Sequence, residues 1–69
     1  MKVVVKDPIQ LRMILIQKGF SQRNFSKSVG MSENYFNQII NNKKNPSPIV
    51  AKRIADQLEL TFEDLFIIQ

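Results

Sequence analysis

The chain has 69 residues, and a domain of this size buries only about 60% of the surface that its unfolded chain exposes, so we expect one domain over residues 1–69. It contains no His and no Cys, which removes the usual general base near neutral pH, thiol nucleophiles, disulfides and Cys/His zinc sites; no catalytic residue, metal or cofactor is expected. Residues 1–53 hold ten Lys or Arg against Asp7 and Glu33 (net +8), whereas residues 54–69 hold four acids (net −4). Such a basic segment suits a polyanionic partner, and a solvated basic surface without a partner is the alternative.

Five helices are predicted, each beginning after a residue whose side chain can accept hydrogen bonds from the first turn. These capping residues are Asp7, Ser21, Ser32, Ser47 and Thr61. The predicted helices cover about residues 8–18, 22–29, 33–42, 48–58 and 62–66. Pro8 and Pro48 fit the first helical position, and Gly19 and Gly30 can end a helix in the left-handed conformation.

Apolar residues recur every three or four positions along these helices, which indicates one buried face on each. The expected core residues are Leu11, Ile14, Phe25, Phe36, Ile39, Ile54 and Leu58. The helix at 33–42 carries amides on its opposite face, and residues 41–46 form a basic loop. Residues 3–5 and 66–68 are β-favouring runs that can form a short β-pair between the two ends of the chain.

The two short helices on either side of Gly30-Met31-Ser32 have the arrangement of a helix-turn-helix, whose second helix can enter the major groove of DNA. The string Phe20-Ser21-Gln22-x-x-Phe25-Ser26-x-x-Val29-Gly30-Met31-Ser32-x-x-Tyr35-Phe36-x-x-Ile39 carries the resemblance, together with Asn42-Lys43, Pro46-Ser47, Ile54-Ala55, Leu58 and Glu63-Asp64-Leu65. Over residues 9 to 66 the chain closely resembles the Cro/CI-type, lambda-repressor-like helix-turn-helix family (Xre family). The resemblance implies a compact, all-α, five-helix domain that binds duplex DNA, commonly as a dimer.

The amide face of the helix at 33–42 is suited to base recognition, because Asn and Gln offer a donor and an acceptor that match N6 and N7 of adenine. Solvated surface amides are the alternative interpretation. The resemblance implies base-reading positions at Glu33, Asn34 and Gln38, with Ser32, Tyr35 and Asn37 beside them. The Glu33 carboxylate can accept from cytosine N4 or stabilise the helix N-terminus, and the sequence leaves both roles open.

Contacts with the DNA backbone require donors around this face. The resemblance implies that Gln22 and Asn41 occupy phosphate-binding positions of the family. Arg23, Lys43 and Lys44 are further candidates, with solvated surface cations as the alternative. Many relatives have an Arg–Glu pair where this chain has Leu15 and Ile40, so we expect these two residues to touch in the core.

The leading interpretation is a sequence-specific transcriptional regulator of duplex DNA, with repression expected by analogy with the family. The second is a protein-interaction module of the same fold, such as an antitoxin or antirepressor partner, and an enzyme is not expected. A homodimer on a two-fold operator is expected, with residues 3–5 lying beside residues 66–68; a strand pair within one chain and no dimer is the alternative. Because no apolar run approaches about 18 residues and no signal peptide is visible, we expect a cytoplasmic protein without a membrane partner.

Overall fold

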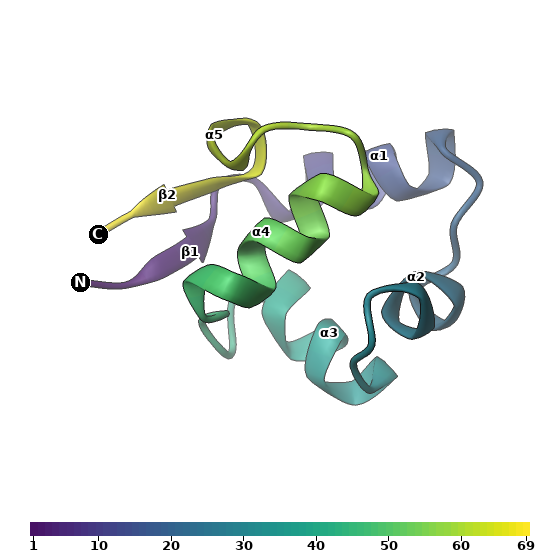
Figure 1. Cartoon of the computed structure of the whole chain (residues 1–69), viewed down its shortest axis with the longest axis horizontal. Helices are drawn as coiled ribbons and strands as arrows, with labels where there is room; N and C mark the ends of the chain where they lie inside the picture. The colour runs from purple at the N-terminus through teal and green to yellow at the C-terminus, as the bar shows by residue number, and fades with distance from the viewer.

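The computed structural model describes residues 1–69, and its elements follow one another as two strands at the ends of the chain and five helices between them (Figure 1). They are β1 (Val3–Val5), α1 (Pro8–Gln17), α2 (Gln22–Ser28), α3 (Glu33–Ile40), α4 (Pro48–Gln57), α5 (Phe62–Leu65) and β2 (Phe66–Ile68). The five predicted helices and the possible β-pair are therefore confirmed. None of the helices has the length and apolar character needed to cross a membrane.

Every helix begins at the predicted capping residue, whose side-chain oxygen accepts from backbone N–H groups of the first turn. In α5 the arrangement is reciprocal, because Thr61 Oγ1 accepts from the Asp64 N–H and Asp64 Oδ2 accepts from the Thr61 N–H at 3.0 Å. These bonds satisfy backbone donors that have no partner within the helix. They explain why short polar side chains fix where each helix starts.

The helix ends are less regular than the starts. Gly19 and Gly30 have φ of 81° and 77°, as predicted for left-handed stops, and Asn42 and Glu59 adopt φ of 58° and 59° without being glycine. The prediction that the last helix includes Phe66 is wrong. With φ of −131° and ψ of 157°, Phe66 is extended and begins β2, because its backbone pairs with β1.

The two strands form an antiparallel pair within one chain, with the register Val3↔Ile68, Val4↔Ile67 and Val5↔Phe66. Lys2 and Gln69 extend the pairing by exchanging two backbone hydrogen bonds of 2.7 and 2.8 Å. We call residues 2–6 and 65–69 the terminal strand pair. Figure 1 shows that it brings the two termini together at one end of the long axis, with α2 toward the other end. The pairing lies within one chain, as expected for a short β-pair between the two ends of the chain.

One hydrophobic core connects all seven elements and contains fifteen buried residues. They are Val3, Val5, Leu11, Leu15, Phe25, Val29, Phe36, Ile39, Ile40, Ala51, Ile54, Ala55, Leu58, Leu65 and Phe66. Of the predicted core residues, Ile14 is only half-buried and packs against this cluster. Leu15 and Ile40 are both buried in the cluster, as expected for two aliphatic residues where many relatives have charges.

Candidate nucleic-acid interface

The α2 and α3 helices pack against each other as a helix-turn-helix. The rings of Phe25 in α2 and Phe36 in α3 lie with centroids 5.0 Å apart in the core. Between the helices, Gly30 takes the left-handed conformation and the Met31 N–H donates to the Ser26 carbonyl at 3.0 Å. This short turn, fixed by core packing on both sides, holds the exposed face of α3 at a defined angle to α2.

The exposed surface of α3 is formed by polar side chains, while Phe36, Ile39 and Ile40 are fully buried beneath them. Gln38 is half-buried, and the exposed residues of α3 and its C-cap are Glu33, Asn34, Asn37 and Asn41. All but one are amides. The predicted division of this helix into a core face and an amide face is therefore present in the structure.

A hollow of about 460 Å³ lies where the beginning of α2 meets the first turns of α3. Its lining consists of four polar side chains and no hydrophobic residue: Gln22, Glu33, Asn34 and Asn37. We call it the polar hollow. Four residues predicted separately for base or backbone contacts are thus gathered on one surface, and Asn37 Nδ2 donates to Gln22 Oε1 across it at 3.1 Å.

Three other residues predicted for base reading lie outside the polar hollow. The Ser32 hydroxyl caps α3 by accepting from the Tyr35 N–H at 3.1 Å. Tyr35 is half-buried against the core, and the Lys44 ammonium lies 5.9 Å from the centroid of its ring. Gln38 is half-buried further along α3, and its backbone carbonyl accepts from the Lys43 and Lys44 N–H groups. Its side chain is therefore only partly accessible to a partner.

The predicted backbone-contact residues surround this surface. Gln22 is the first residue of α2, and the neighbouring Arg23 is exposed. Lys43 and Lys44 are exposed in the loop after α3, which their backbone N–H groups tie to the Gln38 carbonyl at 2.8 and 3.2 Å. The one ion pair of the molecule joins Lys52 to Asp56 within α4, so no carboxylate neutralises these cations.

Arg12 is a site residue that the sequence did not indicate. Its guanidinium donates through Nη2 to Asn41 Oδ1, and Asn41 Nδ2 donates in turn to Asn37 Oδ1 at 3.2 Å. Arg12 lies off the apolar stripe of α1, so periodicity marks it only as surface charge, and its partner is 29 residues away. No local sequence signal could have found this contact.

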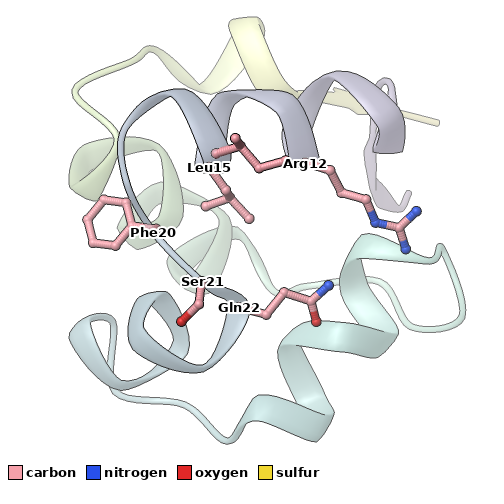
Figure 2. Close-up of a pocket in the computed structure, with 6 residues that line it drawn as sticks. Arg12, Leu15, Phe20, Ser21 and Gln22 are labelled. Atoms are coloured by element: carbon pink, nitrogen blue, oxygen red, sulfur yellow. The ribbon is translucent and has the colours of Figure 1, made fainter.

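A cleft of about 200 Å³ separates α1 from the start of α2 and is lined by Arg12, Leu15, Ile16, Phe20, Ser21 and Gln22. Figure 2 shows the Arg12 side chain extending from α1 toward α3, while the Gln22 side chain lies between α2 and α3. Leu15, Ile16 and Phe20 form the apolar part of the cleft. The polar end of the cleft thus lies beside the hydrogen bonds that join Arg12, Asn41, Asn37 and Gln22.

A family model described as helix-turn-helix matches residues 11–65. The chain belongs to the Cro/CI-type helix-turn-helix family. Membership supports a function in DNA binding and transcription regulation, as the resemblance in its sequence implied. A search of the curated proteins found no match for this chain.

The fold of this chain is similar to that of two solved proteins, each 19% identical to it. One is the clp gene regulator ClgR from Corynebacterium glutamicum, with a TM-score of 0.74; the match covers 83% of this chain and 61% of ClgR. The other is SinR, a master regulator for biofilm formation solved in complex with DNA, with a TM-score of 0.72 and coverage of 81% of this chain and 90% of SinR. These similarities show a shared fold, and the chain spans about 61% of the length of ClgR.

Proposed function

We propose that this regulator is a sequence-specific repressor that places α3 in the major groove of duplex DNA and acts by occupying its operator. The observation that supports this most directly is the polar hollow, because it joins the amide face of α3 to the start of α2 without an apolar interruption. Asn34 and Gln38 are the proposed adenine-reading amides, since each can offer N–H and C=O groups in one plane. The protein acts by occupancy and not by catalysis.

The proposed division of roles follows the position of each side chain. Glu33, Asn34 and Gln38 contact base edges, and Ser32, Tyr35 and Asn37 support them. Gln22, Arg23, Asn41, Lys43 and Lys44 bind phosphates. In the first turn of α3, the Glu33 carboxylate is placed both to accept from cytosine N4 and to stabilise the helix N-terminus. Phosphate contacts set the register of the helix on the duplex, and base contacts supply the sequence preference.

Selection of bound sites from a pool of random duplexes tests this function. We expect a defined half-site containing adenine, repeated with two-fold symmetry. Asn34→Ala should relax the preference at one base position, whereas Asn24→Ala, an exposed amide on α2 outside the polar hollow, should leave the selected motif unchanged. Recovery of no motif at about 50 mM salt, where phosphate contacts are strong, would refute sequence-specific binding.

We further propose that two copies bind the operator as a homodimer through the C-terminal segment. The terminal strand pair leaves Ile68 56% exposed, and the neighbouring Ile67 and Met1 are also exposed. A two-fold dimer separates two α3 helices by about 34 Å, one turn of DNA, and repeats the half-site accordingly.

Sedimentation of the protein with its selected duplex tests the dimer. Ile68→Lys is expected to weaken operator binding and give a lower mass on DNA without lowering the thermal midpoint. Ile9→Lys adds the same charge to another exposed Ile and should not change the mass. A monomer of the unsubstituted chain on a single, unrepeated half-site would exclude the homodimer.

A second candidate function, binding of a protein partner, is favoured by one surface of α1. Ile9, Met13 and Ile16 are spaced four and three residues apart, and Ile9 and Ile16 are 68% and 74% exposed. Large exposed apolar side chains on one helix face are typical of protein-binding surfaces. Duplex affinity at low and moderate salt separates the two functions, because a module dedicated to a protein partner has no steep, salt-dependent binding of a selected duplex.

A further inference from the structure

Three consecutive hydrogen bonds between side chains connect α1 to α2 across the surface of α3. Arg12 donates to Asn41 Oδ1, Asn41 Nδ2 donates to Asn37 Oδ1, and Asn37 Nδ2 donates to Gln22 Oε1. We call these four residues the amide relay. Arg12 lies on α1, Gln22 on α2 and Asn37 on α3, and Asn41 is the C-cap of α3, so the relay exists only once the helix-turn-helix has packed on α1. Figure 2 shows Arg12 and Gln22, the two ends of the relay.

The amide relay has a direction, because an Arg guanidinium can only donate hydrogen bonds. Asn41 must therefore turn its oxygen toward Arg12, which turns its nitrogen toward Asn37. The same constraint passes to Asn37 and then to Gln22, whose Oε1 is engaged by Asn37 Nδ2. The Gln22 Nε2 has no protein partner, so both of its N–H donors remain available.

We propose that Arg12 is a positioning residue that fixes the amide orientation of Gln22, so that Gln22 presents N–H donors to a DNA phosphate. The opposite orientation would present Oε1, an acceptor, to phosphate oxygens, which are also acceptors. The inference rests on the proposed function, since it assigns Gln22 a phosphate contact. It differs from a phosphate contact by Arg12 itself, because Arg12 acts through two intervening amides.

The orienting effect of Arg12 should change the affinity for DNA more than the stability of the fold. Arg12, Asn37 and Asn41 are exposed in the free protein, where water competes for each hydrogen bond. When a duplex covers the face, water leaves, the bonds strengthen in the lower dielectric, and a wrongly turned amide loses its partner. Arg12 should therefore lower the cost of orienting Gln22 at the moment of binding.

The first test uses the free protein and needs no DNA. Side-chain amide resonances of Asn41, Asn37 and Gln22 are recorded by ¹⁵N-correlated NMR for the unsubstituted chain, Arg12→Met and Arg53→Met. Arg53 is an exposed arginine of α4 that makes no side-chain hydrogen bond or ion pair, so its variant controls for the lost charge. All three resonances should shift in Arg12→Met and stay in place in Arg53→Met. A shift confined to Asn41 would show that orientation does not pass along the relay, and would overturn the proposal.

The second test is a double-mutant cycle on duplex affinity. Arg12→Met should weaken binding of the selected duplex about three- to tenfold, as for the loss of one ordinary hydrogen bond, and Arg53→Met should weaken it less. In a Gln22→Ala background, Arg12→Met should have no larger effect than Arg53→Met, because the side chain that it orients is gone. Equal effects of Arg12→Met in both backgrounds would mean that Arg12 contacts phosphate by itself, which refutes the relay but leaves the proposed function intact. Absence of duplex binding by the unsubstituted chain would refute both.

Discussion

Restoring an ion pair at positions 15 and 40 provides a stringent test of how the core is packed. Leu15 and Ile40 are 2% and 0% exposed, and both belong to the one hydrophobic cluster. Many relatives carry Arg and Glu at these positions, so the family's geometry predicts that the two side chains touch. Leu15→Arg introduces a charge into this cluster, and Ile40→Glu does the same from the α3 side.

The magnitudes follow from burial. An unpaired buried charge costs about 3–5 kcal/mol, which approaches the whole stability expected for 69 residues at about 0.05–0.15 kcal/mol per residue. Ile40→Glu should lower the free energy of unfolding by most of this amount, because the short Glu side chain cannot reach out of the core. Leu15→Arg should cost about 3 kcal/mol, since Leu15 lines the cleft beside α2 and a long Arg can direct its guanidinium through it toward water.

Urea denaturation of the single and double variants measures the coupling between the two positions. The double variant should recover at least about 1 kcal/mol relative to the sum of the single effects, the coupling typical of side chains in contact. Leu15→Met is the matched control, because it keeps the site apolar and should cost less than about 1.5 kcal/mol. Purely additive single effects would show that Leu15 and Ile40 are not neighbours.

Three further outcomes are expected. The affinity for a selected duplex should fall as salt rises, with a slope of about −7 in a plot of log affinity against log salt concentration for a dimer that neutralises about eight phosphates. Titrations at low and moderate salt measure this slope. An affinity that does not depend on salt would exclude the phosphate contacts. Asn34→Ala or Gln38→Ala should cost about 1–3 kcal/mol on the preferred site and alter one position of the selected motif, whereas Lys43→Ala should weaken all sequences alike and reduce the slope by about 1. The pKa of Asp64 is lowered from 3.8 by hydrogen bonds with the Thr61 backbone and side chain, so its contribution to stability is complete above the unfolded pKa and is lost as the pH falls through the folded value. The difference in thermal midpoint between the unsubstituted chain and Asp64→Asn should therefore narrow below about pH 4, and a constant difference down to pH 2 would contradict this role.

The starts of the helices could be predicted because capping depends on residues three positions apart at most. Ser32 and Tyr35, for example, form their bond within one turn. The inclusion of Phe66 in the last helix failed for the opposite reason: its conformation is decided by pairing with Val5, at the far end of the chain. Because residues 3–5 and 66–68 lie at opposite ends of the sequence, local patterns could not predict whether they pair within one chain.

In the candidate site too, features set by local sequence could be predicted and features set by distant contacts could not. Helical periodicity was enough to place Asn34 and Asn37 on the exposed face of α3, because that face is defined by the helix alone, whereas Gln38 is half-buried. The burial of Tyr35 and the contact of Arg12 with Asn41 depend on how α1 and the loop after α3 pack around α3. The angles at which these helices pack cannot be predicted from residue type and spacing.

The terminal strand pair has a consequence for the order in which the chain folds. Its contacts join residues at opposite ends of the sequence, so closing them requires a loop of nearly the whole chain, whereas α2 and α3 meet across a four-residue turn. Loop-closure entropy favours the shorter connection, and contacts of long sequence separation form late. The strand pair should accordingly open first and close last, with faster backbone hydrogen exchange in Val4 and Ile67 than in Ile39 and Ile40. Fluctuations at the termini can then occur while α2 and α3 stay assembled.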